Sequence, residues 1–247
     1  MELYTRTDIG LVRSSNQDSV DGGFLHDGKV MWAVLCDGMG GANGGSVASS
    51  TAVKVARENM SFFDIHASEA QSENFLCEVV AKANSAVYNR QKRDISLHGM
   101  GTTMELVVVC RRWAMVAHVG DSRVYCIHRN KIRQITEDHS VVQEMVNRGE
   151  LTPQQARVHP NRNYITRAIG VSPGVRTDYI ELPFENNDIL IVCSDGLSNY
   201  ISGESILSYS KLYEGDELTN ALVEKAKNHG GADNISVAVL YANNILE

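Results

Sequence analysis

Four aspartates in this chain stand beside glycine and beside an apolar run. Asp37 and Asp195 each end such a run and precede a glycine, and Asp121 follows Gly120 at the end of a third run. Asp233 lies just before the apolar run Ile235–Tyr241. A single Asp-Gly pair is typical of a turn. Four carboxylates that converge in a low dielectric repel one another, and they are tolerated together where a cation neutralises them. The set therefore indicates a metal site.

The type of ligand narrows the identity of the ion. Carboxylate oxygens favour Mg²⁺ or Mn²⁺, whereas a zinc site would draw on histidine and cysteine. The chain has no H-E-x-x-H motif and no Cys–His spacing typical of zinc ligands. We hypothesise that Asp37, at the end of the run Val30–Cys36, binds this ion.

The sequence lacks the motifs of several other catalytic and nucleotide-binding sites. The glycines after Asp37 do not complete G-x-G-x-x-G, because Asn43 takes the third position, and no G-K-[ST] motif is present. No cysteine has an arginine six residues further on, which excludes a cysteine-dependent phosphatase loop. G-x-S-x-G is also absent, so no hydrolase nucleophile elbow is predicted.

The apolar patterns predict alternating blocks of strands and helices. The tight spacing at Arg111-Arg112 and at Gly120-Asp121-Ser122 predicts antiparallel hairpins between the strands on either side of each. Ser72 is the expected N-cap of the second helix. The predicted strands are 2–8, 30–36, 102–110, 113–119, 123–128, 176–182, 188–193 and 235–241. The predicted helices are 45–63, 72–93, 140–148, 152–156, 202–210 and 216–229.

Helices that come in pairs between blocks of strands favour an α+β fold over a parallel βαβ array. The polar segment Glu137–Asn163 interrupts the strand pattern and reads as an insertion. No repeat or linker is visible, so residues 1–247 are expected to form one domain. The stretch Arg13–Asp18 has no periodicity, and taken alone it is equally well explained as a solvated loop.

Composition limits the possible partners and the location. The chain is 43% hydrophobic and 21% charged, which is typical of a globular protein. Its net charge of −7 argues against a general nucleic-acid binder. No signal peptide or membrane-spanning run is visible. The five cysteines form no C-x-x-C pair and are expected to be reduced, buried thiols of a cytoplasmic protein. A monomer that binds neither membrane nor nucleic acid is expected.

Six ordered motifs together resemble the PPM (PP2C-type) metal-dependent protein serine/threonine phosphatases, in particular the stand-alone bacterial members. They are Arg13-Ser-Ser-Asn-Gln-Asp18, Asp37-Gly-Met-Gly-Gly41, Gly101-Thr-Thr103, Gly120-Asp-Ser-Arg123, Ser194-Asp-Gly196 and Gly231-Ala-Asp-Asn234. The resemblance spans essentially the whole chain. It implies an α-β-β-α sandwich, in which two antiparallel sheets are flanked by helix pairs.

The resemblance also implies metal-binding roles for individual residues. Asp37 would bridge two Mn²⁺ or Mg²⁺ ions, and the Gly38 carbonyl would complete the first ion. Asp195 and Asp233 would hold the second ion together with Asp37. Asp18 would act on the first ion through water.

Three further features follow from the same resemblance. Asp121 and Asp195 would hold a third, weaker ion, which Asn163 would approach. Arg13 would bind the substrate phosphate. The insertion Glu137–Asn163 would be the variable flap beside the site.

Physical chemistry supports this assignment independently. Hydrolysis of phosphate monoesters is among the slowest uncatalysed reactions, so the catalyst needs a strong nucleophile and compensating positive charge. A pair of divalent ions supplies the positive charge directly, and it supplies the nucleophile by acidifying a bridging water. The Arg13 guanidinium offers a planar two-donor fork for phosphoryl oxygens.

One residue departs from the pattern of many eukaryotic relatives. They carry a histidine after the Asp-Gly pair, where it is thought to protonate the leaving group, whereas this chain has Met39, which donates no proton. Either a metal-bound water or another residue would then serve as the acid. His139 in the flap is a candidate, with a structural role as the alternative.

The expected function is metal-dependent hydrolysis of phosphoserine and phosphothreonine in proteins, including Hanks-type Ser/Thr kinases and their substrates. One alternative is a catalytically inactive phosphoprotein-binding module on the same fold. Such a module would be expected to have lost Asp37, Asp195 or Asp233, and all three are present. A second alternative is a phosphatase dedicated to one partner-switching regulator, which the absence of an added sensor domain disfavours.

Overall fold

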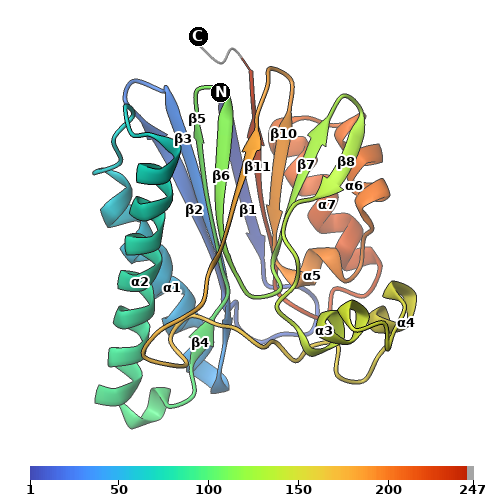
Figure 1. Ribbon diagram of the computed structural model, residues 1–247. Helices are drawn as coiled ribbons and strands as arrows, with labels where there is room; N and C mark the ends of the chain where they lie inside the picture. Colours follow the sequence, from blue (N-terminus) through green and yellow to red (C-terminus); the bar gives the residue numbers. More distant parts are fainter. Residues whose placement is uncertain (244–247) are drawn as a thin grey trace.

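Two antiparallel sheets pack face to face in this computed structural model, which describes residues 1–243 and, of Ala42 and Asn43, the backbone alone (Figure 1). The first sheet has the order β1 (Glu2–Asp8), β11 (Ile235–Tyr241), β10 (Ile189–Cys193), β7 (Arg123–His128), β8 (Lys131–Gln134). The second has the order β2 (Asp18–Leu25), β3 (Val30–Met39), β5 (Met104–Cys110), β6 (Trp113–Val119), β9 (Asp178–Pro183), with the short β4 (Gly101–Thr102) paired to the end of β3.

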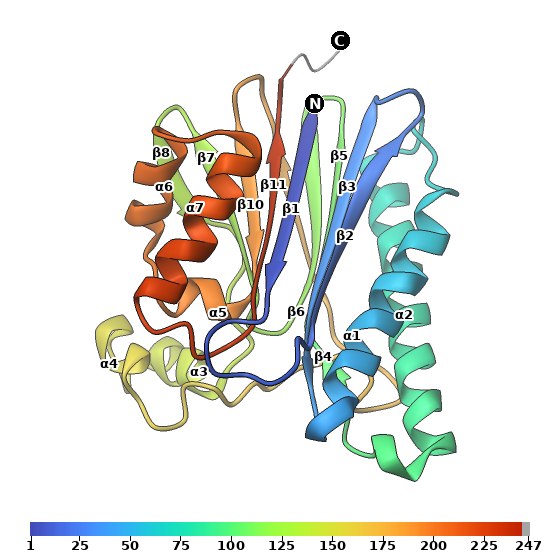
Figure 2. The same ribbon diagram turned by 180° about the vertical axis from the view of Figure 1, so that it is seen from behind.

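Helices cover the outer face of each sheet (Figure 2). The long helices α1 (Gly41–Met60) and α2 (Glu69–Arg93), followed by the 3₁₀ turn η1 (Ile95–Leu97), pack on the second sheet. The helices α5 (Asp195–Ser198), α6 (Gly203–Ser210) and α7 (Gly215–Asn228) pack on the first. The short helices α3 (Val141–Asn147) and α4 (Pro153–Arg157) lie at one end. The predicted α-β-β-α sandwich is confirmed.

Strand β3 is buried on both faces, which explains its uninterrupted apolar sequence. Val30, Trp32 and Val34 contribute to the core under α1 and α2, whereas Met31 and Ala33 contribute to the core between the sheets. A strand that is buried on both faces has no polar face to alternate with. The strand can therefore hold Asp37 firmly at its far end.

The predicted hairpin around Gly120 is wrong. β6 pairs with β5 and β9, while β7 pairs with β8 and β10 in the other sheet. Residues 120–122 therefore connect the two sheets. Spacing alone could not distinguish a hairpin from such a crossing, and the crossing places Asp121 at the open end of the sandwich.

Several element limits also differ from those predicted. The N-cap of α2 is Ser68, which forms a capping box with Gln71, and Ser72 is buried within the helix. Strand β2 was not predicted, because its glycines weaken a strand pattern. A Cβ at Gly22 would lie 2.6 Å from the Trp32 carbonyl oxygen, so the close strand packing requires glycine there.

The structure bears on two expectations from composition, the buried cysteines and the lack of a membrane-spanning segment. All five cysteines are free, and four are buried, but Cys77 is exposed. Within residues 1–243, no helix is both long and apolar enough to cross a bilayer.

Candidate active site

The predicted aspartates lie close together at one end of the sandwich, where strands end and loops begin. A pocket of about 450 Å³ opens there. The predicted site residues that line it are Arg13, Asp37, Gly38, Asp121, Asn163, Asp195 and Asp233. They come from loops and strand ends of both sheets, so the pocket exists only where the two sheets face each other. We refer to it as the carboxylate pocket.

Asp18 lies directly behind this pocket, opposite Asp37 in the register of β2 and β3. Its residue is only 7% exposed, and neither of its carboxylate oxygens has a hydrogen-bond partner among the described residues. A buried carboxylate without donors is costly unless it is protonated or bound to a cation. A cation close to Asp18, bound directly or through water, would remove this cost.

Two threonines at the end of the neighbouring strand β4 fix the backbone of Asp37. The Asp37 N–H donates to Thr103 Oγ1 at 2.8 Å, and the Asp37 carbonyl accepts from the Thr103 N–H at 2.9 Å and from Thr102 Oγ1 at 2.8 Å. Thr103 Oγ1 also lies 2.9 Å from Ser122 Oγ, beside Asp121. Sequence reasoning had assigned these hydroxyls no role, although they belong to two of the six motifs.

Asn234 is a second residue whose role the sequence did not reveal. Its side-chain oxygen accepts from the Gln17 N–H at 2.8 Å, and its amide donates to the carbonyls of Ile9 and Ser15 at 2.9 and 3.0 Å. These bonds attach the loop that carries Arg13 to the turn that carries Asp233. Asn234 thus positions both groups at once.

Arg13 and Asp233 are joined to each other. Arg13 Nη2 donates to Asp233 Oδ2 at 2.7 Å, and Asp233 Oδ1 accepts from the Asn234 N–H at 2.9 Å. The Arg13 side chain is 52% exposed, so solvent screens this ion pair and its contribution to stability is small. The guanidinium is therefore free to exchange Asp233 for another anion at the mouth of the pocket.

Burial and mutual repulsion raise the pKa of four carboxyls around the pocket. Burial raises the pKa of Asp18 to about 7; the nearby hydroxyls of Ser236 and Ser194 oppose this shift, and the charge of Asp195 adds to it. Burial and the charge of Asp233 raise the pKa of Asp195 to about 6. Burial first, and the neighbouring carboxylates second, raise the pKa of Asp37 and Asp121 well above the usual range. Without added positive charge, these groups can coexist only by holding protons.

The donor set fits hard divalent cations. Four carboxylates line the pocket, from Asp37, Asp121, Asp195 and Asp233. Asp195, and Asp18 opposite Asp37, have buried oxygens without a partner among the described residues. Among the described residues, no three His, Cys, Asp or Glu side chains form a group that could hold an ion by itself. Ions held here would therefore need carbonyls or water as well as carboxylates, which is usual for Mg²⁺.

Comparison with known proteins identifies the family. Residues 12–228 match the family model for protein phosphatase 2C. The chain belongs to the protein phosphatase 2C family. It is 34% identical to the serine/threonine phosphatase stp of Listeria innocua over 246 residues, which cover 98% of this chain and 96% of that protein. It is 35% identical to the protein phosphatase PhpP of Streptococcus pneumoniae, with 98% of each chain covered.

Solved structures of this family share the fold. The serine/threonine phosphatase of Streptococcus agalactiae superimposes with a TM-score of 0.90 and 33% identity, over 98% of this chain and 99% of that chain. The catalytic domain of the phosphatase PstP, in complex with two manganese ions, gives a TM-score of 0.84 and 32% identity, with 96% of each chain covered.

For a protein phosphatase 2C, the source of the leaving-group proton matters, and the surroundings of the candidate His139 can be described. His139 is buried and lies outside the lining of the carboxylate pocket. Burial and the adjacent His118 lower its pKa to about 4, so the ring is neutral near pH 7. Its Nδ1 accepts from the Gly120 N–H at 3.1 Å, and its Nε2 lies 3.0 Å from Asp178 Oδ2 and 2.9 Å from Arg167 Nη1. This position and these contacts favour the structural alternative for His139 over the role of acid.

Met39 forms a wall of the carboxylate pocket. A Cβ added at Gly101 would lie 2.7 Å from Met39 Cε, so the methionine packs closely on β4. A thioether has no proton to give. The pocket of this family member therefore has an apolar surface where many eukaryotic relatives have a histidine.

Proposed function

We propose that this protein hydrolyses phosphoserine and phosphothreonine in other proteins, with divalent cations in the carboxylate pocket. The observation that carries the proposal is the convergence of buried, partnerless carboxylate oxygens with an exposed arginine at the mouth of one pocket. The family membership and the names of the relatives support it.

Asp37, Asp195 and Asp233, with the Gly38 carbonyl, would hold two Mn²⁺ or Mg²⁺ ions, and Asp18 would contribute through water. When bound, such ions neutralise the carboxylates and acidify a water that can attack phosphorus in line. Asp121 and Asp195 would hold a third, weaker ion beside Asn163, which lines the same pocket. The buried, raised-pKa carboxyls would lose their protons on ion binding.

Arg13 would orient the substrate. Its guanidinium can leave Asp233 and donate two parallel hydrogen bonds to phosphoryl oxygens, which places the phosphorus over the pocket. Met39 and His139 do not protonate the leaving oxygen, so water in the open pocket is left as the proton donor. The threonine hydroxyls and Asn234 keep the carboxylates from moving as charge develops.

The proposed substrates are phosphorylated proteins, among them Ser/Thr kinases and the targets of those kinases. The proposed location is the cytoplasm, and the proposed state is a monomer. The names of the relatives support phosphoprotein substrates.

Hydrolysis of a phosphothreonine peptide tests the proposal. With Mn²⁺ we expect turnover that a chelator abolishes, and we expect the Asp37→Asn variant to lose at least a thousandfold in kcat, since it loses a ligand of both ions. An inactive phosphoprotein-binding module would bind the peptide without hydrolysing it. Equal rates with and without chelator, or in the variant, would exclude the metal mechanism.

A further inference from the structure

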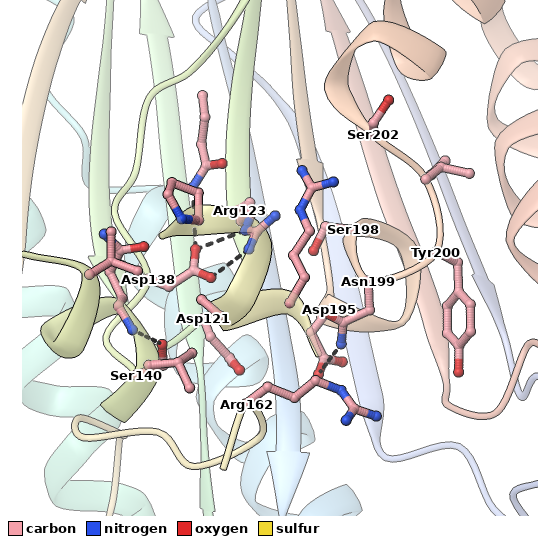
Figure 3. Close-up of a pocket in the computed structure, with 18 of the residues that line it drawn as sticks. Asp121, Arg123, Asp138, Ser140, Arg162, Asp195, Ser198, Asn199, Tyr200 and Ser202 are labelled. Atoms are coloured by element: carbon pink, nitrogen blue, oxygen red, sulfur yellow. Dashed lines mark hydrogen bonds and ion pairs between the residues drawn. The ribbon is translucent and has the colours of Figure 1, made fainter. Parts of the chain in front are cut away.

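A second pocket, of about 460 Å³, lies between the flap and the helices α5 and α6 (Figure 3). We refer to it as the flap-side pocket. Asp121 and Asp195 line both this pocket and the carboxylate pocket, so the two cavities adjoin. Figure 3 shows Arg162 reaching in from the flap toward the end of the pocket where Asp121 and Asp195 lie. Its volume is in the range of sites that take small ligands or single side chains.

Two arginines of the flap give this pocket uncommitted positive charge. Arg123 is already neutralised, since its Nε and Nη2 donate to the two oxygens of Asp138 at 2.8 and 2.7 Å. Arg157 and Arg162 are exposed and line the same cavity. Among the described residues, neither guanidinium has a hydrogen bond or an ion pair. Glu204, at the start of α6, is near enough to feel the charge of Arg157 without pairing with it.

The floor of the flap-side pocket carries a donor that is also uncommitted. Ser198 Oγ is shielded from solvent and has no hydrogen-bond partner in the described part of the chain. Buried hydroxyls are nearly always hydrogen-bonded, and an unpaired one indicates a missing partner. Two free guanidinium groups and a hydroxyl around one cavity suit an oxyanion.

We propose that the flap-side pocket binds an acidic side chain of the substrate, namely a carboxylate or a second phosphoryl group, close in sequence to the phosphoresidue under attack. This inference rests on the proposed function. The shared wall of Asp121 and Asp195 lets one extended segment enter both cavities, because each residue of such a segment spans about 3.3 Å. The net charge of −7 would otherwise repel acidic substrates, so a local pair of arginines is what makes them acceptable.

Matched phosphothreonine peptides test the proposal. One series carries glutamate or a second phosphothreonine at each of the four positions on either side, and the reference peptide carries glutamine there. For the wild type with Mn²⁺ we expect kcat/KM to rise about tenfold for the best-placed acidic residue and to lose this advantage at high salt. In the Arg157→Gln/Arg162→Gln double variant the advantage should fall to about twofold or less.

Controls separate this inference from the proposed function. The double variant should hydrolyse the glutamine peptide at the wild-type rate, and Arg93→Gln, at the exposed end of α2, should keep the full preference. No preference in the wild type, or a preference that survives in the double variant, would overturn the flap-side assignment while leaving the phosphatase intact. If no peptide is hydrolysed, the proposed function fails. Fluorescence anisotropy of the labelled acidic peptide with the wild type and with the double variant then still tests whether Arg157 and Arg162 bind the acidic residue.

A last experiment tests whether the flap-side pocket binds free anions. If inorganic phosphate or sulfate inhibits hydrolysis of the glutamine peptide through Arg157 and Arg162, and acidic peptides gain nothing, the pocket binds free anions instead of substrate side chains. That result would also overturn the proposal.

Discussion

At the scale of single residues, the site is built from groups that are unfavourable by themselves. Asp18 is the clearest example, since both of its oxygens are buried without a partner and its pKa is raised to about 7. Above that pH the folded protein must hold a buried negative charge that the unfolded chain exposes to water. Residues that bind cations are in this way a local cost to stability, which a bound cation offsets.

Asp18→Asn should therefore stabilise the metal-free protein at pH 8. Since the carboxyl has a raised pKa, its ionisation destabilises the fold as the pH rises from about 4 to above 7, and asparagine removes this ionisation. We expect a gain on the order of a few kcal/mol in the free energy of unfolding at pH 8 and almost none at pH 4. Urea unfolding in the presence of a chelator measures both.

The matched control is Asp27→Asn, at an exposed turn position with φ of 55° that asparagine readily adopts. It should change stability by less than about 0.5 kcal/mol at either pH. A similar gain from both substitutions would show that Asp18 is not under electrostatic strain.

Arg13→Ala should raise KM for a phosphopeptide and lower kcat/KM by about a hundredfold, because a bidentate, charge-assisted contact to the phosphoryl group is lost. Arg13→Lys should recover only part of the loss, since an ammonium cannot reproduce the planar fork. Steady-state kinetics with Mn²⁺ measure both variants. Thermal stability should hardly change in either, as the Arg13–Asp233 pair is exposed. An alanine variant with unchanged kcat/KM would remove Arg13 from substrate binding.

At the scale of elements, hydrogen bonds join the β6–β7 connection to the start of the flap. The His139 N–H donates to the Gly120 carbonyl at 2.7 Å, and the Gly120 N–H returns a bond to His139 Nδ1. The His139 carbonyl in turn accepts from the Thr166 N–H at 2.7 Å, where the chain leaves the flap. Asp121 therefore depends on a histidine eighteen residues further along the chain.

Two substitutions at His139 separate its contacts. In His139→Asn the side-chain oxygen can replace Nδ1 and accept from Gly120, whereas His139→Gln reaches toward Asp178 and leaves the buried Gly120 N–H unpaired. We expect the glutamine variant to lose about 1–3 kcal/mol more stability than the asparagine variant. Hydrogen exchange should be faster at residues 120–122 in the glutamine variant only, and its activity should need more Mn²⁺. Equal exchange in the two variants would contradict this role.

This element also shows where sequence reasoning ends. The individual strands 113–119 and 123–128 were predicted from their apolar runs and are confirmed, because local pattern determines a strand. The predicted pairing of 102–110 with 113–119 is also confirmed, but the predicted pairing of 113–119 with 123–128 is wrong, since that choice is decided by contacts with β9 and β10 far along the chain. The aspartates were found because strand-to-glycine spacing is local. The roles of Asn234 and Thr103 were missed because they act through backbone groups distant in sequence, and for the same reason the sequence could not decide between the two roles considered for His139.

At the scale of the whole molecule, acidic groups gather at one end of a protein whose net charge is −7. The raised pKa values of Asp18, Asp37, Asp121 and Asp195 mean that the folded state binds more protons than the unfolded state above about pH 4. Stability of the metal-free protein must then fall as the pH rises through 6 and 7. Cation binding displaces those protons.

We therefore expect Mn²⁺ to raise the melting temperature more at pH 7.5 than at pH 5, by several degrees at millimolar concentration. Differential scanning calorimetry with and without chelator at the two pH values measures the difference. Asp195→Asn should reduce the shift at pH 7.5. A shift that is the same at both pH values would show that the ion does not bind to the protonated carboxyl cluster.

The pairing of β1 with β11 joins two strands that are far apart in sequence, along seven residue pairs. On a ribosome, β1 must wait for its partner until residues 235–241 have emerged, while the hairpin of α1 and α2 can form early from local contacts. Arg13 and Asp233 meet only when β11 docks. A partly synthesised chain therefore has no assembled site, so phosphatase activity would arise in a single late step.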